Sequence, residues 1–170
     1  MTEVSKQEKM ENINNLKEQE VEILIIEDNP GDAELTIRAL KKSHVANHIV
    51  HLVDGAEALD FLFGTGEYTN RNIDNLPKVI LLDLKMPKVD GLEVLRHLKS
   101  DVRTKMIPVV ILTSSAKDPD IKKCYDLGAN SYIVKPVEIN NFVKTISEIG
   151  MYWLLIDKGN LKTTPSTDPI

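Results

Sequence analysis

Residues 79–91 of the chain read Val79-Ile80-Leu81-Leu82-Asp83-Leu84-Lys85-Met86-Pro87-Lys88-Val89-Asp90-Gly91. Four apolar residues lead directly into Asp83, and a turn punctuated by Pro87 and Gly91 follows. This pattern predicts a buried parallel strand that ends at a functional loop. An ionised Asp83 at the end of an apolar run is costly unless other groups compensate its charge, so we expect compensating partners elsewhere in the sequence.

Four further apolar runs have the composition of buried strands, and they cover residues 21–26, 48–53, 108–113 and 131–134. Amphipathic patterns typical of helices follow the runs, over about residues 33–42, 56–63, 92–98, 119–127 and 138–156. The alternation of strands with helices predicts a parallel α/β sheet covered on both faces by five helices.

The two ends of the chain differ in composition from this central part. Residues 1–20 are polar with scattered apolar positions, and we interpret them as a solvated leader that cannot anchor a core of its own. Residues 158–170, rich in Pro, Thr and Ser, are expected to form a flexible tail. The polar stretch 64–77 is predicted to be a surface loop, because its two glycines lack the third glycine and the lysine of a phosphate-binding loop.

The overall composition restricts the compartment and the partners. A chain of 170 residues with 42% hydrophobic content is long enough for one buried core. Its net charge of −5 argues against nucleic acid as a partner, and no apolar run is long enough to span a membrane. The single cysteine, Cys124, excludes an internal disulfide and favours the cytoplasm, and we interpret it as a packing residue.

Polar residues close four of the predicted strands. They are Glu27-Asp28, Asp83, Thr113 and Lys135. In a parallel sheet the carboxyl ends of the strands meet at one edge, which predicts one shared site. Carboxylate ligands suit Mg²⁺, and an aspartate can act as the nucleophile toward phosphorus while a hydroxyl and an ammonium group stabilise the transferring group.

These residues resemble the receiver domain of response regulators, the phospho-accepting part of two-component signalling. The resemblance rests on Glu27-Asp28, Asp83 with Met86-Pro87 and Asp90-Gly91, Thr113 with Ser114, Tyr132, and Lys135-Pro136. It covers about residues 21–156 and implies a receiver domain over residues 21–157. The implied fold is flavodoxin-like, a doubly wound five-stranded parallel sheet of order 2-1-3-4-5 with five helices.

The resemblance also implies a role for each matching residue. Asp83 would be the phosphoacceptor, Asp28, Asp83 and the Lys85 carbonyl would coordinate Mg²⁺, Glu27 would hold a metal-bound water, Thr113 and Lys135 would contact the phosphoryl group, and Tyr132 would be the aromatic switch partner of Thr113. A cis peptide bond is expected at Lys135-Pro136.

The sequence is most similar to single-domain receivers associated with bacteriophytochrome-type kinases. The signs are the run Glu27 to Asp32, the insertion at 61–77 and Trp153. This implies a phosphoryl donor that is a sensor histidine kinase, with the phytochrome type as one candidate, or a phosphotransfer protein. The chain would then be no enzyme in its own right and would signal by binding a protein once phosphorylated.

We also expect a homodimer. In the last helix, Phe142, Ile146, Ile149, Trp153 and Ile156 form the stripe that packs on the sheet. Met151, Leu154 and Leu155 lie away from that stripe, and we expect them to form a dimer surface with the helix near 118–127 and the strand of Tyr132.

Two other functions compete with this interpretation. One is an Mg²⁺-dependent phosphohydrolase with an aspartyl nucleophile, but such enzymes usually place a second acid two residues after the nucleophile, where this chain has Lys85. The other is a receiver-like binding module that works without phosphorylation. The intact set Asp28, Asp83, Thr113 and Lys135 argues against it.

Overall fold

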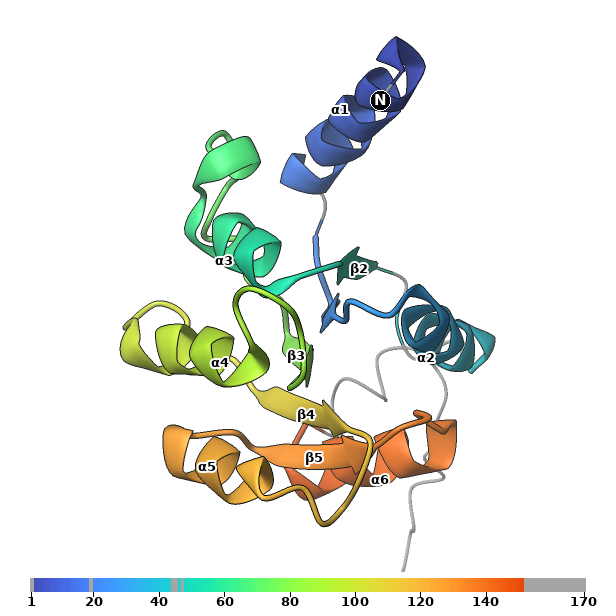
Figure 1. Cartoon of the computed structure of the whole chain (residues 1–170), viewed down its shortest axis with the longest axis vertical. Helices are drawn as coiled ribbons and strands as arrows, with labels where there is room; N and C mark the ends of the chain where they lie inside the picture. Colours follow the sequence, from blue (N-terminus) through green and yellow to red (C-terminus); the bar gives the residue numbers. More distant parts are fainter. Residues whose placement is uncertain (1, 19, 44–45, 47, 152–170) are drawn as a thin grey trace, which may run out of the picture.

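The computed structural model describes residues 2–18, 20–43, 46 and 48–151. Five strands form one parallel sheet, drawn in Figure 1. They are β1 (Ile23–Ile26), β2 (Ile49–Leu52), β3 (Val79–Asp83), β4 (Val109–Thr113) and β5 (Ser131–Val134). Their order is β2-β1-β3-β4-β5, so the predicted topology is confirmed.

The register of the sheet brings the strand ends together. Ile26 at the end of β1 lies opposite Leu82, the residue before Asp83. Asp83 in turn lies opposite Leu112, and Thr113 lies opposite Val134. The polar residues that close β1, β3, β4 and β5 therefore share one edge of the sheet.

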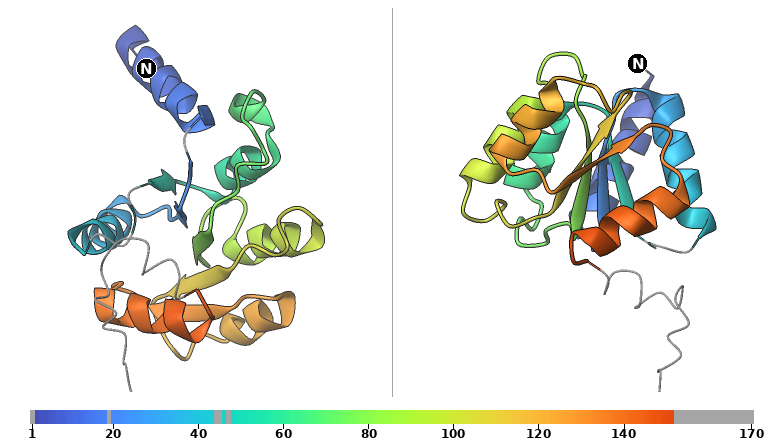
Figure 2. Two further views of the ribbon diagram at one scale, coloured as in Figure 1. Left: turned by 180° about the vertical axis from the view of Figure 1, so that it is seen from behind. Right: turned by 90° about the horizontal axis from the view of Figure 1, so that it is seen from below.

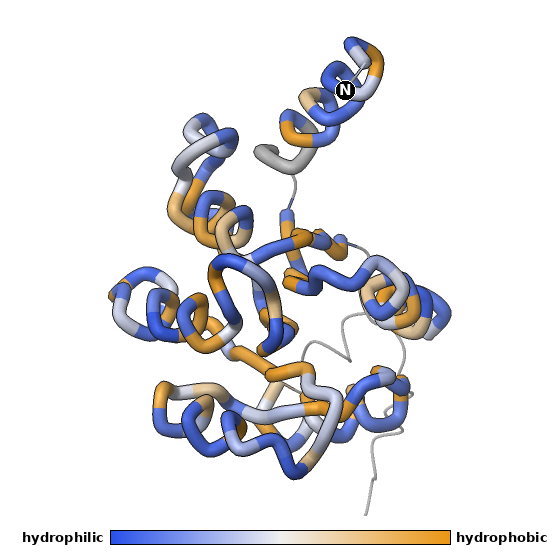
Figure 3. The backbone as a smooth tube through the Cα atoms, viewed as in Figure 1, coloured by the Kyte–Doolittle hydropathy of each residue, from blue (hydrophilic) through white to orange (hydrophobic). Residues whose placement is uncertain are grey.

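Helices cover both faces of the sheet, as the right-hand view of Figure 2 shows. One face carries α3 (Gly55–Phe63), α4 (Gly91–Ser100) and α5 (Asp120–Leu127), and the other carries α2 (Pro30–Lys42) and α6 (Ile139–Glu148). Alternate residues of a strand face opposite sides of the sheet. Leu24 and Ile26 therefore pack in the core beneath α3, α4 and α5, and Ile23 and Ile25 pack in the core beneath α2 and α6. Figure 3 shows the resulting concentration of apolar residues in the central strands.

A sixth helix corrects the expected number of five. Residues of the polar leader form α1 (Glu3–Glu18), which extends away from the sheet in Figure 1. Most of its described side chains are exposed, but Ile13 is buried in the core and Lys9 forms an ion pair of 3.3 Å with Glu67. The leader is therefore anchored rather than fully solvated.

The connection 64–77 is also more than a surface loop. It contains a short 3₁₀ helix, η1 (Gly66–Tyr68). Tyr68 is buried, packs edge-on against Phe61 and donates a hydrogen bond of 2.9 Å to Glu57. The buried guanidinium of Arg71 stacks 3.8 Å from the centre of the Phe61 ring and donates to the Phe61 carbonyl. Tyr68 and Arg71 therefore attach the 64–77 connection to α3 through their contacts with Phe61 and Glu57.

The last helix is shorter than predicted. It ends at Glu148, and Gly150 follows with a φ of 82°, in the left-handed region that favours glycine. Phe142 and Ile146 are buried against the sheet as expected, but Met151 is buried as well and cannot belong to an exposed patch. Trp153, Leu154, Leu155, Ile156 and the predicted tail lie outside the described residues.

Two further properties bear on the predictions from composition. Cys124 is buried in the core, as its packing role requires, and burial raises the pKa of its thiol to about 11. None of the helices in the described part of the chain has both the length and the apolar composition needed to cross a bilayer.

Candidate functional site

The carboxyl ends of the strands enclose a cleft of about 260 Å³. It is lined by Glu27, Asp28, Asn29, Asp32, Asp83, Leu84, Lys85, Leu112, Thr113, Ser114, Asp118 and Lys135. The sequence predicts one shared site at this edge, and the structure brings the residues that close β1, β3, β4 and β5 together there.

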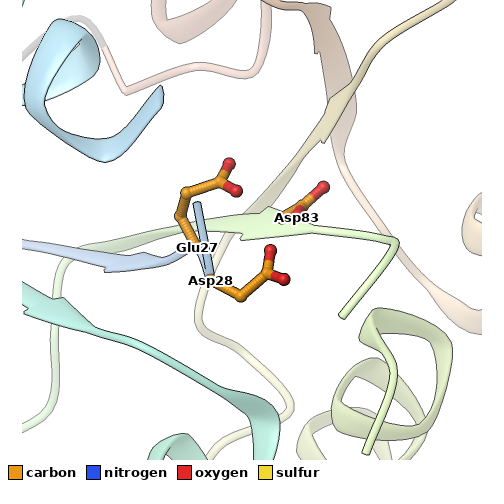
Figure 4. Close-up of side chains that lie close together, drawn as sticks. All are labelled: Glu27, Asp28 and Asp83. Atoms are coloured by element: carbon orange, nitrogen blue, oxygen red, sulfur yellow. The ribbon is translucent and has the colours of Figure 1, made fainter. Parts of the chain in front are cut away.

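Three carboxylates meet in the cleft, as Figure 4 shows. One oxygen each of Glu27, Asp28 and Asp83 lies within 4.8 Å of the other two. Glu27 and Asp83 are buried, with 1% and 5% of their surface exposed, while Asp28 is more open to solvent. The site thus has two buried acids at its base and one at its rim.

The loop after Asp83 depends on a close backbone approach. The Gly91 amide donates a hydrogen bond of 2.9 Å to the Leu84 carbonyl. A Cβ atom at position 91 would lie 2.3 Å from the Asp83 carbonyl oxygen, a contact that only glycine avoids. Asp90 caps α4 by accepting from the Glu93 amide at 2.9 Å. The Asp90-Gly91 pair therefore holds the start of α4 against the backbone of Asp83 and Leu84.

Lys135 provides the cation of the site. Its ammonium donates hydrogen bonds of 3.0 Å to Glu27 and 2.9 Å to Asp32, and lies 3.6 Å from Oδ1 of Asp83. The expected cis peptide bond at Lys135-Pro136 is present. The loop after β5 thus delivers one positive charge to three carboxylates.

The charges of the cleft shift the pKa values of its central groups. Burial of the Asp83 carboxyl and the negative charge of Glu27 together raise its pKa to about 7, although Lys135 acts in the opposite direction. Burial lowers the pKa of Lys135, but its hydrogen bonds to Asp32 and Glu27 and the charge of Asp83 outweigh this and raise the pKa above its usual value. Lys135 is therefore permanently charged, while Asp83 needs more positive charge to be fully ionised at neutral pH.

The residues present suit a hard divalent cation. Mg²⁺ prefers carboxylate and water oxygens and typically takes one or two carboxylates from the protein. Five carboxylates line the cleft, from Glu27, Asp28, Asp32, Asp83 and Asp118. The Lys135 ammonium contacts three of them, Glu27, Asp32 and Asp83. A bound cation would offset the remaining negative charge and would lower the pKa of Asp83.

Thr113 is buried at the end of β4, with its hydroxyl turned toward the following loop. The hydroxyl oxygen lies 3.1 Å from the Ser115 carbonyl and 3.4 Å from Oδ2 of Asp118, and it accepts from the Ser115 amide at 3.3 Å. The contacts of this hydroxyl are therefore with residues of the 114–118 loop.

The side chains of two predicted site residues, Lys85 and Tyr132, are not part of the acidic cluster. The Lys85 amide lies 3.5 Å from Oδ1 of Asp83, but its side chain is 73% exposed and lies 3.9 Å from Asp118. Tyr132 is partly buried on β5, opposite Ile111, and its ring packs edge-on against Tyr125, with 6.4 Å between the ring centres. It lines a separate groove and not the cleft.

Two residues that line the cleft were not predicted from the sequence. Asn29 caps α2 by accepting from the Asp32 amide, and the Asp32 carboxylate binds Lys135. One oxygen of Asp118 accepts from the Asp120 amide at the start of α5, and the other lies 3.4 Å from the Thr113 hydroxyl in the cleft. Asp32 could have been predicted, because it closely follows Glu27-Asp28 in the sequence. The position of Asp118 could not, because it depends on the path of the 114–119 loop.

Comparison with known proteins identifies the family of this site. Residues 23–147 match the model of the response regulator receiver domain. Among curated relatives, a probable methanogenesis regulatory protein of Methanothrix harundinacea, FilR2, is 42% identical over 135 residues, covering 78% of this chain and 83% of the relative. Response regulator Rcp1 of Synechocystis is 39% identical over 132 residues, covering 78% and 88%.

Solved structures give the same result. The bacteriophytochrome response regulator RtBRR is 47% identical, with a TM-score of 0.73, and the match covers 79% of this chain and 81% of RtBRR. The Mn²⁺-bound form of Rcp1 is 39% identical (TM-score 0.63; coverage 78% and 93%). The phosphorylated cyanobacterial phytochrome response regulator RcpA is 40% identical (TM-score 0.65; coverage 80% and 95%). The predicted similarity to phytochrome-associated regulators is confirmed, and the chain belongs to the response regulator receiver domain family.

Proposed function

We propose that this protein accepts a phosphoryl group on Asp83 from a sensor histidine kinase, with Mg²⁺ bound, and signals by binding another protein once phosphorylated. One observation carries the proposal. A buried aspartate closes the central strand β3, with two further carboxylates within 4.8 Å and the Lys135 ammonium at 3.6 Å. This arrangement concentrates an oxygen nucleophile and the charges that phosphoryl transfer requires.

The bonds that change in the transfer belong to the Asp83 carboxylate and the donor. A carboxylate oxygen forms a bond to the phosphorus of a phosphohistidine as the phosphorus–nitrogen bond breaks. The departing imidazole nitrogen keeps the electron pair of that bond. Lys135, which lies beside Oδ1 of Asp83, is placed to stabilise negative charge on the transferring oxygens.

Glu27, Asp28 and Asp83 would hold the Mg²⁺ ion, which supplies positive charge to the phosphoryl oxygens when it is bound. Their geometry supports this assignment, as does the existence of a Mn²⁺-bound form of the related Rcp1. Lys85 belongs to the proposed set through its carbonyl and not through its side chain, which faces solvent.

A phytochrome-type histidine kinase is the proposed donor, supported by the similarity to RtBRR and RcpA. The test is phosphotransfer from a bacteriophytochrome histidine kinase that has first been labelled with ³²P. We expect the label to move to the wild-type chain within seconds to minutes and to stay on the kinase when Asp83→Asn is added. Equal transfer to both proteins would refute the assignment of Asp83. No transfer to either would refute the donor class.

The position of Lys85 argues against the phosphohydrolase alternative. A lysine stands two residues after the nucleophile, where that class usually has its acid, and its ammonium lies 3.9 Å from Asp118. We therefore propose a signalling protein and not an enzyme that turns over external phosphate esters.

We further propose that phosphorylation of Asp83 changes the positions of Thr113 and Tyr132 and so alters the α5–β5 face. The same face would be the surface of a homodimer. Tyr125 and Val134 are exposed on this face beside Tyr132, which supports a binding surface, although Met151 cannot contribute to it. Sedimentation with and without a phosphoryl mimic tests the dimer. A monomer at high concentration under both conditions would refute it.

A further inference from the structure

Asp118 is a carboxylate in the cleft that the proposed reaction does not use. It lies in the connection between β4 and α5, yet its side chain is only 5% exposed. It lines the cleft together with Asp83 and Thr113. A buried carboxylate beside a phosphorylation site has an electrostatic cost, so its contacts indicate what it does there.

The two oxygens of Asp118 contact different parts of the molecule. Oδ1 accepts a hydrogen bond of 2.9 Å from the Asp120 amide, in the first turn of α5. Oδ2 lies 3.4 Å from the Thr113 hydroxyl and 3.9 Å from the Lys85 ammonium. One side chain therefore links the start of α5 to the Thr113 hydroxyl, while its ion pair with Lys85 is long and the Lys85 side chain is 73% exposed.

A phosphoryl group on Asp83 would compete with Asp118 for the Thr113 hydroxyl. Thr113 has one hydroxyl proton, and its acceptors in the structure belong to Ser115 and Asp118. A phosphoryl group brings about 1.5–2 negative charges at neutral pH. These charges would share the cleft with the Asp118 carboxylate, and repulsion between like charges is strong where solvent is largely excluded.

We propose that Asp118 is a positioning residue that holds the Thr113 hydroxyl in the unphosphorylated arrangement and opposes phosphorylation of Asp83. Phosphorylation then displaces Asp118, which releases the Asp120 amide and alters the first turn of α5. The inference rests on the proposed function, because it requires that Asp83 accepts the phosphoryl group.

The test is the affinity for beryllofluoride, a mimic of a phosphoryl group on aspartate, measured with Mg²⁺ present. Asp118→Asn removes the charge and keeps the shape. We expect it to bind beryllofluoride about three- to tenfold more tightly than the wild type. Asp120→Asn is the matched control, because Asp120 carries the same charge two residues away, pairs with Lys123 and does not line the cleft. We expect its affinity to stay within about twofold of the wild type.

Hydrogen exchange at the Asp120 amide separates positioning from a structural role. In the wild type, we expect beryllofluoride to speed this exchange. In Asp118→Asn, we expect the amide to be as protected as in the metal-free wild type and to change little when the mimic is added. Asp118→Ser, which keeps an acceptor without the charge, is the second variant if Asp118→Asn does not fold.

The outcomes distinguish the inference from the proposed function. Equal beryllofluoride affinity in Asp118→Asn and the wild type would overturn the inference alone, as would an Asp120 amide in the wild type that does not respond to the mimic. A wild-type protein that does not bind beryllofluoride at all would overturn the proposed function, and the inference with it.

Discussion

The ammonium of Lys135 lies 3.6 Å from Oδ1 of Asp83 and is hydrogen-bonded to Glu27 and Asp32. A single cation therefore stabilises three carboxylates that approach from β1, α2 and β3. Any divalent ion that enters the cleft must share Glu27 and Asp83 with this lysine. The ion pair thus links the stability of the metal-free protein to its affinity for metal.

Replacing Lys135 tests that link. Lys135→Gln leaves buried carboxylates without their cation, so we expect the metal-free protein to lose about 1–3 kcal/mol of unfolding free energy. Because Mg²⁺ no longer competes with the ammonium, we expect it to bind about three- to tenfold more tightly. Urea unfolding and calorimetric titration measure the two effects. Lys144→Gln is the control, since its pair with Glu148 is exposed and should matter little. Weaker Mg²⁺ binding in Lys135→Gln would contradict the account.

Asp83 should make the metal-free protein less stable as the pH rises. Its folded-state pKa is raised to about 7, against about 3.9 in an unfolded chain. Between these values the folded protein binds more protons than the unfolded chain, so the free energy of unfolding falls as the pH rises from about 4 to 7.

Asp83→Asn removes this dependence. We expect the variant to be more stable than the wild type by about 1–3 kcal/mol at pH 8, with the difference shrinking toward pH 4. Thermal unfolding in a chelator across this pH range measures it. A variant that is less stable than the wild type at pH 8 would show that Asp83 is not held at an electrostatic cost.

Gly91 should tolerate no side chain. The Cβ of Gly91→Ala would lie 2.3 Å from the Asp83 carbonyl oxygen and 2.7 Å from Leu84 Cα, both backbone atoms. We expect a loss of about 2–4 kcal/mol in unfolding free energy and a weakened metal site. Gly31→Ala is the comparison, because its nearest contact is the side chain of Asn29 at 3.2 Å. Equal stability of the two variants would contradict the close approach at position 91.

Thr113 should couple phosphorylation to the rest of the protein without being needed for it. We expect Thr113→Ala to accept the phosphoryl group on Asp83 but to show no change in the environment of Tyr132. Phosphorylation is read by intact mass, and Tyr132 by NMR. Thr113→Ser, which keeps the hydroxyl, should restore the response. A full response in Thr113→Ala would exclude this route.

The sequence predicts those site residues that stand directly at the end of an apolar strand. Asp83, Thr113 and Lys135 each close or follow an apolar strand, and parallel topology then forces them to one edge. Asp118 could not be placed in this way, because its position depends on the path of a loop. An Asp-Pro pair is typical of the start of a helix, and Asp118 does accept from the Asp120 amide there, so the pair alone does not indicate a site residue.

Other differences have equally specific causes. Ile13 is the one buried hydrophobic residue among the described side chains of α1, and the scattered apolar residues of this helix form no periodic face that would predict its contact. Tyr68 and Arg71 of the 64–77 connection are buried, although the polar composition of this connection is typical of a surface loop. Gly150 ends α6 before the apolar pattern of the sequence ends.

The most direct test of the central claim is intact-protein mass spectrometry after incubation with Mg²⁺ and a small phosphoryl donor such as acetyl phosphate. We expect the wild type to gain the mass of one phosphoryl group, which is lost on treatment with base, and Asp83→Asn to gain none. A folded wild-type protein that gains no adduct, or an Asp83→Asn variant that gains the same adduct, would contradict phosphorylation of Asp83.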